Sequence, residues 1–453
     1  MIDRRIPPAL GQAAVSHFPA IDRGSVAGVE LRLARQPDSP FVSLSWVAPA
    51  GGERDPQGRE GRATLTASTL DEGTSRSSSA EIAARVERLG GAIGSTADWD
   101  AGYLRIEVLA RDVTAAFELV GEVLLDPVFP EPEIDRLRRQ RLADLQALRE
   151  RPSAIADVAL SRAIYGAATY GRLLGGTEAT LSQLGRADLQ AAHRELWLAQ
   201  GLCLVAAGAV TREAVEAWLE GLLAGTKLAA TDASHPVPAV PPPGDGRRVV
   251  LIDRPNAAQS ELRIGHLGVA RTHPARSQLQ VLNAILGGKF TSRINLNLRE
   301  RHGFTYGAFS RFTGRRHAGP FSVSAAVANP SVGAAVREVL AEMDRIRQRP
   351  VEPEELSDAR DYLIGVFPYT IQTAADLAGR LEDLAQFGLP DDEVDRHLQR
   401  IATTSAADVQ AAALSFLSPE HACVVAVGPA TELRPQLADF GPLTELAVGE
   451  LFS

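Results

Sequence analysis

The chain has 453 residues, of which 45% are hydrophobic and 23% charged, and its formal net charge is −9. This length exceeds one ordinary hydrophobic core and predicts two or more domains, in a composition typical of globular proteins. The acidic balance argues against nucleic acid as a partner, and no apolar run of the roughly 18 residues needed to cross a membrane is present.

The N-terminal residues carry charges with no apolar stretch behind them, so no secretory signal is recognised. Cys203 and Cys423 are the only cysteines, which is too few for a cysteine-rich zinc site or a disulfide framework. We therefore expect a cytoplasmic location, with a periplasmic one open if a signal peptide was removed.

Short alternating segments and amphipathic segments follow one another through the first half. In chain order they are an alternating strand at 42–47, a helix at 79–89, an alternating strand at 104–108, a helix at 113–124, a long helix at 133–150 and an apolar strand at 202–207. This order predicts an α+β fold, in which helices pack on one face of a mostly antiparallel sheet.

The segment between the first strand and the first helix carries a recognisable frame. Residues 61–74 read Gly-Arg-Ala-Thr-Leu-Thr-Ala-Ser-Thr-Leu-Asp-Glu-Gly-Thr. This resembles the pitrilysin/insulinase family of zinc peptidases, the inverzincins, whose members have Gly-x-Ala-His-x-x-Glu-His-x-x-x-x-Gly-Thr here. The framing residues are kept, whereas the three chemical positions are Thr64, Ala67 and Ser68.

Those three replacements predict that the metal site is degenerate. Two histidines four apart on a helix can hold zinc, and the glutamate between them deprotonates the metal-bound water. The hydroxyls of Thr64 and Ser68 are poor zinc ligands, and Ala67 cannot accept a proton. The family's third ligand, a glutamate about 75 residues further on, falls near Asp144. One carboxylate does not retain zinc, so we expect no cofactor in this chain and no activity of the chain alone.

The chain repeats itself across a proline-rich stretch at 236–244. We interpret 229–246 as a linker between an N-terminal domain at 1–228 and a C-terminal domain at 247–453. Five markers recur at an offset of 219 or 220: Val42 with Leu262, Leu104 with Val323, Val113 with Val332, Asp188 with Asp408, and Cys203 with Cys423. One such match could arise by chance, but five spread over both halves predict a duplicated domain.

The second half contains a segment that resembles the family's second-domain signature. Arg299 follows a leucine and is separated by six residues from Tyr306. In family members this pair reaches across a chamber to the zinc site of the opposing domain. A guanidinium and a phenol are suitable donors to the negative charge that develops on a scissile carbonyl oxygen. Without the resemblance, Arg299 would be a solvated helix end and Tyr306 the start of a strand.

The resemblance implies a non-catalytic subunit of a heterodimeric zinc metallopeptidase. Its two domains would form half of a clamshell chamber and give Arg299 and Tyr306 to the active site of a homologous, zinc-bearing partner of similar length, which cleaves unfolded peptides. The alternative is a structural scaffold similar to the core proteins of cytochrome bc-type complexes, with no role in proteolysis. An autonomous peptidase with another metal site is disfavoured, because the nine histidines lack helical ligand spacing.

Overall fold

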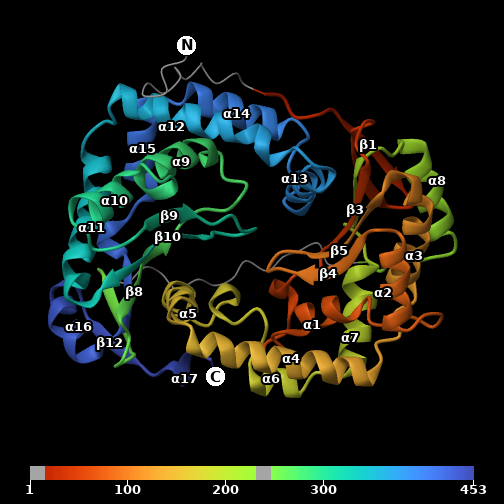
Figure 1. Ribbon diagram of the computed structural model, residues 1–453, viewed down its shortest axis with the longest axis horizontal. Helices are drawn as coiled ribbons and strands as arrows, with labels where there is room; N and C mark the ends of the chain where they lie inside the picture. The colour runs from red at the N-terminus through yellow and green to blue at the C-terminus, as the bar shows by residue number, and fades with distance from the viewer. Residues whose placement is uncertain (1–15, 231–245, 453) are drawn as a thin grey trace, which may run out of the picture.

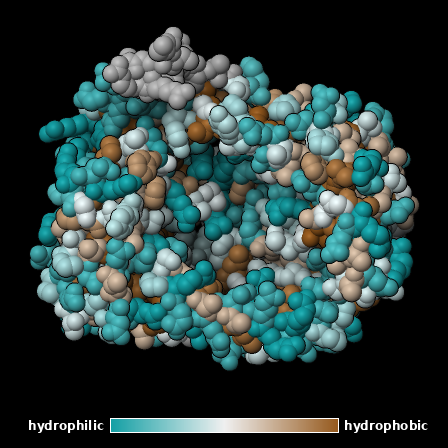
Figure 2. All heavy atoms as spheres, in the orientation of Figure 1, coloured by the Kyte–Doolittle hydropathy of each residue, from teal (hydrophilic) through white to brown (hydrophobic). Residues whose placement is uncertain are grey.

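The computed structural model describes residues 16–230 and 246–452, which form two lobes of similar design around a central opening (Figure 1). The space-filling view shows a hollow between the lobes on the same face (Figure 2). The proline-rich stretch at 236–244 lies outside the described residues. Within the described ranges, no helix is long and apolar enough to cross a membrane.

The first lobe is built on a six-stranded sheet with the order β1-β2-β6-β3-β5-β4. Its strands are β1 (Ile21–Val26), β2 (Val29–Arg35), β3 (Phe41–Ala48), β4 (Ala92–Ala97), β5 (Gly102–Leu109) and β6 (Cys203–Gly208). Only the β2–β6 pair is parallel. Its main helices on one face are α1 (Arg62–Thr69), α2 (Ser79–Arg88), α3 (Val113–Leu125), α7 (Arg186–Ala192) and α8 (Arg212–Leu223). The predicted mostly antiparallel sheet with helices on it is confirmed.

The second lobe repeats this design with the order β12-β7-β11-β8-β10-β9. Its strands are β7 (Arg248–Asp253), β8 (Gln259–Leu267), β9 (Ala308–Phe312), β10 (Pro320–Ala328), β11 (Cys423–Gly428) and β12 (Leu443–Leu446). The helices on one face include α9 (Arg276–Asn283), α11 (Val332–Gln348), α15 (Ala406–Phe416) and α16 (Ala430–Leu437). The repeated markers fall on equivalent elements, since Cys203 opens β6 and Cys423 opens β11.

The second face of each sheet is covered by a helix from the other half of the chain. Helix α5 (Pro152–Tyr165) packs on β8 and β11, where Ile155 shares a core with Val425. Helix α13 (Ala374–Gln386) packs on β3 and β6, where Leu381 shares a core with Val205. The expectation of helices on one face alone is therefore incomplete. This exchange buries both faces of the central strands and ties the two lobes together.

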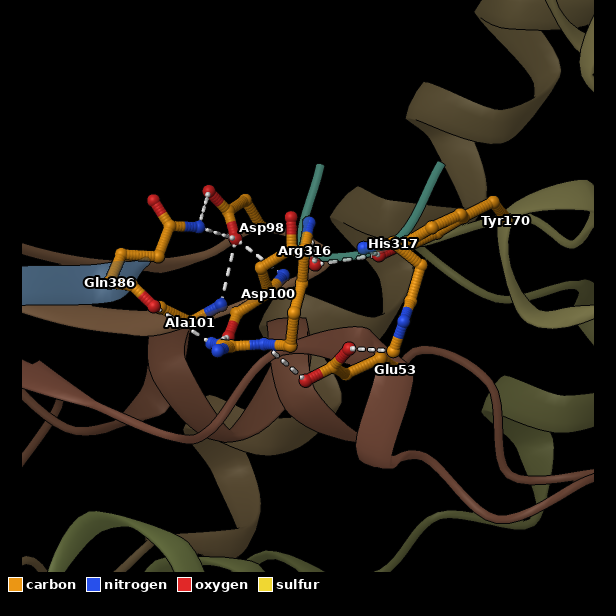
Figure 3. Close-up of polar contacts among 8 residues, drawn as sticks. All are labelled: Glu53, Asp98, Asp100, Ala101, Tyr170, Arg316, His317 and Gln386. Atoms are coloured by element: carbon orange, nitrogen blue, oxygen red, sulfur yellow. Dashed lines mark hydrogen bonds and ion pairs between the residues drawn. The ribbon is translucent and has the colours of Figure 1, made fainter. Parts of the chain in front are cut away.

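A polar cluster joins the lobes where the two equivalent hairpins meet (Figure 3). Arg316, in the β9–β10 loop, donates from Nε to Oε1 of Glu53 at 3.2 Å. Its Nη2 donates to the carbonyl oxygens of Asp100 at 3.2 Å and Gln386 at 3.0 Å. The Tyr170 hydroxyl donates to Oδ1 of Asp100 at 2.7 Å, and burial raises the pKa of that carboxyl. A basic loop of the second lobe thus meets an acidic turn of the first.

Candidate functional site

The first framing residues of the degenerate motif start helix α1. Gly61 has φ 93°, and a Cβ there would lie 2.8 Å from the carbonyl oxygen of Gly175. The buried Asp55 carboxylate accepts hydrogen bonds from the amides of Gly61 at 3.0 Å and Ala63 at 2.9 Å, as an acid at a helix N-terminus does. Burial raises the pKa of Asp55 to about 7. These framing residues serve the helix whether or not a metal is held.

The three former metal positions are satisfied within the protein. The Thr64 hydroxyl donates to the carbonyl of Gly61 at 3.1 Å, and the Ser68 hydroxyl donates to the carbonyl of Thr64 at 2.5 Å. Ala67 is fully buried in the core of the first lobe. No side chain at these positions offers a free lone pair of the kind that zinc prefers.

A guanidinium lies against the second of these ligand positions. Arg141, on helix α4 (Glu131–Glu150), donates from Nη2 to Oγ of Ser68 at 2.9 Å. A fixed positive charge beside this position opposes a divalent cation. The residues here therefore do not fit the zinc that the family resemblance implies. In the described part of the chain, no three His, Cys, Asp or Glu side chains are grouped so that they could hold a metal ion.

The predicted third position is not brought to this helix. Asp144 is exposed and forms no hydrogen bond or ion pair with any described residue. Leu145, one helical turn after Arg141, is buried in the core that α5 shares with the second sheet. The sequence placed a carboxylate near Ser68, whereas the structure places Arg141 there.

The last framing residue anchors the turn that follows helix α1. The Thr74 hydroxyl donates to Oε1 of Glu122 at 2.6 Å, and Arg85 donates to Oε2 of the same carboxylate at 2.6 Å. Burial alone would raise the pKa of Glu122, but the hydrogen bonds from Arg85, Thr74 and Ser77 outweigh it and hold the pKa at about 2. Thr74 thus hydrogen-bonds the buried carboxylate that pairs with Arg85, and this contact joins the turn to helix α3.

Replacing this carboxylate tests that role. We expect Glu122→Gln to lower the free energy of unfolding by about 2–3 kcal/mol at neutral pH, because Arg85 loses its buried partner. Since the folded pKa is depressed, the contribution of Glu122 is complete above the unfolded value near 4.5 and is lost as the pH falls towards about 2. Chemical denaturation at several pH values measures this. The exposed Glu118 on the same helix gives the control, Glu118→Gln, and an equal loss in both variants would contradict the assignment.

Arg299 and Tyr306 both belong to the second lobe. Arg299, in the helical turn Leu296–Arg301, has its guanidinium 4.5 Å from the ring centroid of Phe290 and its Nε 3.3 Å from Oε1 of Glu300. Tyr306 is 88% exposed. The buried Asn295 holds this segment, since it donates to the carbonyl of Phe290 at 2.6 Å and accepts from the amide of Ala308 at 2.9 Å. The Arg–Tyr spacing found the pair, but no sequence signal marked Asn295.

This pair is remote from the degenerate metal position of the same chain. Helix α1 lies in the first lobe, and α10 (Arg293–Asn295), which leads into the Arg299 turn, lies on the far side of the opening (Figure 1). Among the described residues, no hydrogen bond or ion pair joins Arg299 or Tyr306 to helix α1. The structure therefore separates the two parts of the sequence-predicted site.

Comparison with known proteins gives consistent matches. Residues 32–178 match the family model described as insulinase (peptidase family M16), and residues 183–363 match the peptidase M16 inactive domain. An uncharacterized zinc protease of Streptomyces coelicolor is 24% identical over 389 residues, which cover 84% of this chain and 81% of that protein.

Two solved structures are also similar. The structure of a peptidase M16 inactive domain from Pseudomonas fluorescens has a TM-score of 0.84 and 25% identity, and covers 90% of this chain and 98% of its own. A chain of complex III2 from Candida albicans has a TM-score of 0.79 at 14% identity and covers 94% of this chain and 100% of its own, which is a likeness of fold.

Proposed function

The chain belongs to the insulinase (M16) peptidase family, and from this premise we propose that it is the non-catalytic subunit of a heterodimeric zinc metallopeptidase. The partner is a homologous chain of similar length with intact zinc ligands. This subunit completes the partner's active site with Arg299 and Tyr306. The cofactor is the partner's zinc, and the substrate is an unfolded peptide.

The partly exposed Arg299 and the exposed Tyr306 carry this proposal. Tyr306 projects into solvent from an ordered segment, so its ring is not stabilised by burial within this chain. A guanidinium and a phenol are suitable donors to an oxyanion that forms on a neighbouring molecule. The Arg141 guanidinium beside Ser68 supports the complementary point, that this chain does not hold the metal itself.

The peptide has a physically suitable place to bind in the second lobe. Strand β9 is the edge of the second sheet and, among the strands that the structure describes, pairs only with β10. Phe309 and Arg311 project from it to solvent in the alternation expected of a strand with one exposed face. An extended peptide can add to such an edge through backbone hydrogen bonds. An unfolded peptide has its backbone donors and acceptors free along its whole length, which favours unfolded substrates.

Mixing the chain with a zinc-bearing partner tests the proposal. We expect neither protein alone to cleave a peptide at the rate of the mixture. Arg299→Ala should lower kcat of the mixture by about 100-fold and Tyr306→Phe by about tenfold, because each removes a donor to the oxyanion. Arg301→Ala, an exposed arginine two residues further on, is the matched control and should leave kcat unchanged.

Assembly is measured on the same samples by size-exclusion chromatography. If the partner alone reaches the full rate, complementation is wrong. If the complex forms and both pair variants cleave as fast as the unchanged mixture, donation of Arg299 and Tyr306 is wrong, and the subunit is a scaffold.

A further inference from the structure

A cavity of about 480 Å³ lies at the seam between the lobes, apart from the degenerate metal position. Helices α9, α12 (Pro353–Val366) and α14 (Glu393–Thr403) form its walls together with strand β9 and helix α13. Helix α13 packs on the sheet of the first lobe, so one wall belongs to each lobe. Much of the lining is apolar and includes Leu279, Phe312, Leu363, Phe367, Leu398 and Ile401.

The same cavity gathers arginines in excess over acids. Four arginines line it, Arg271, Arg276, Arg311 and Arg380, with only Asp383 and Glu393 as acids. Asp383 forms an ion pair with Arg271, whose Nη2 lies 2.6 Å from Oδ2 of Asp383. Glu393 is paired with Arg396 and Arg400, which are not part of the lining. In the ranges that the structure describes, the three remaining arginines of the cavity form no ion pair with a carboxylate.

Arg271, Arg276 and Arg380 all lie near His397 in this lining, whereas the side chain of Arg311 is exposed. The Arg276 guanidinium makes one hydrogen bond to a described residue, from Nη1 to the carbonyl of Phe312 at 3.2 Å. Burial and the neighbouring Arg271 lower the pKa of Arg276 to about 10, so it stays charged at neutral pH. His397 does not relieve the repulsion, because burial and the surrounding arginines lower its pKa to about 3. Its ring nitrogens bond neutral groups, Ser277 at 2.7 Å and Gln280 at 2.6 Å.

The protein as a whole is acidic, with a net charge of −9, so this local excess of unpaired cations around an apolar cavity favours an anionic occupant. Desolvated like charges disfavour the empty state, and an anion between them removes that cost. Planar guanidinium groups match a carboxylate through paired hydrogen bonds. The apolar walls require that the anion carry an apolar body.

We propose that this cavity binds a carboxylate borne on an apolar group. At roughly 30 Å³ for each water-sized group, the volume accepts a body of about 10 to 15 non-hydrogen atoms. A medium-chain fatty acid and the apolar C-terminal residues of a peptide share this chemistry. Because helix α13 and the helices of the second lobe both line the cavity, the occupant lies between parts that pack on different sheets. The cavity shares strand β9 and Arg311 with the proposed peptide-binding edge, whereas Arg380 belongs to the cavity alone.

Calorimetric titration of the full chain tests the proposal with matched pairs of probes. One pair is octanoate and 1-octanol, and the other is the dipeptide Leu-Phe with a free or an amidated C-terminus. At least one carboxylate should bind about tenfold or more tightly than its neutral counterpart, because a hydrogen bond to a charged group is the stronger kind. If the difference appears with octanoate and 1-octanol, the ligand is a fatty acid; if it appears with the two forms of the dipeptide, the ligand is a peptide C-terminus. Inorganic phosphate, which has no apolar body, should bind more weakly than that carboxylate.

Arg380→Gln supplies the variant, because Arg380 lines the cavity and is not part of the proposed peptidase site. We expect it to weaken the preferred carboxylate about tenfold without lowering the melting temperature of the empty protein, since an unpaired cation is removed. Arg396→Gln, on the rim helix α14 but outside the lining, should leave the affinity unchanged. Equal binding of acid and neutral probe, phosphate binding as tight as the carboxylate, or no effect of Arg380→Gln would overturn the proposal.

Discussion

Restoring the zinc ligands is expected to fail while Arg141 remains. The restored set consists of Thr64→His, Ala67→Glu and Ser68→His. Leu145 is left unchanged, because it is buried in the core that α5 shares with the second sheet. We expect this variant to purify without stoichiometric zinc. Adding Arg141→Ala should then raise the zinc affinity at least a hundredfold.

The physical reason is the charge that Arg141 places beside residue 68. Two unit charges 4 Å apart repel by about 4 kcal/mol at an effective dielectric constant of 20, and a divalent ion doubles that figure. The arginine side chain can move away and relieve part of this repulsion. We therefore expect a smaller effect of at least a hundredfold in zinc affinity, equivalent to about 2.7 kcal/mol. Elemental analysis and competition with a chelating dye measure the affinity.

Two comparisons keep this prediction falsifiable. Thr64 and Ala67 are buried, so larger side chains cost about 1–3 kcal/mol each, and both restored variants must be folded by circular dichroism. They differ only at residue 141, which isolates the effect of the guanidinium. Arg139→Ala, an exposed change two residues earlier on the same helix, should not restore binding. Tight zinc binding with Arg141 still in place would refute the argument.

The fold was predictable from the sequence because it depends on patterns that repeat locally. The alternation around Leu104 and Val323 marks strands β5 and β10, and the helices that begin at Val113 and Val332 follow them in both lobes. The degenerate motif was recognisable for a related reason. Gly61 has a left-handed backbone that starts helix α1, so the frame is needed by the fold after the ligands are gone.

What the sequence could not predict depends on contacts between distant residues. Arg141 and Ser68 are 73 residues apart. The amphipathic pattern of a helix does not predict which distant side chain each of its residues will contact. For the same reason, the sequence did not show that α5 and α13 each pack on the sheet of the other half. The apolar run at 202–207 predicted a strand, but the helix that covers its second face lies more than 160 residues away.

Arg316→Ala is expected to have the largest effect on stability, because one side chain holds the meeting point of the two hairpins. Its guanidinium bonds Glu53 and the carbonyls of Asp100 and Gln386, and both acids are nearly inaccessible to solvent. Removing the guanidinium takes the Arg316 charge from the buried Glu53 and a donor from two carbonyls, which costs about 3–5 kcal/mol. Denaturant unfolding should show this loss, together with a separation of the single transition into two as the lobes uncouple.

The pH dependence of this defect separates an electrostatic cause from a loss of packing. Burial raises the pKa of Asp100, so the folded state binds that proton more tightly than the unfolded chain, and the folded state gains stability as the pH falls. Without Arg316 the acids are less compensated, and the gain should be larger. The deficit of Arg316→Ala should therefore shrink as the pH is lowered from neutrality, where a packing defect would stay constant. Arg315→Ala removes a neighbouring cation whose guanidinium carbon lies 5.7 Å from the centroid of the Tyr170 ring, and should cost under about 1 kcal/mol. A deficit that is the same in both variants, or that does not change with pH, would show that the lobes are held by the exchanged helices α5 and α13 rather than by the charges between their hairpins.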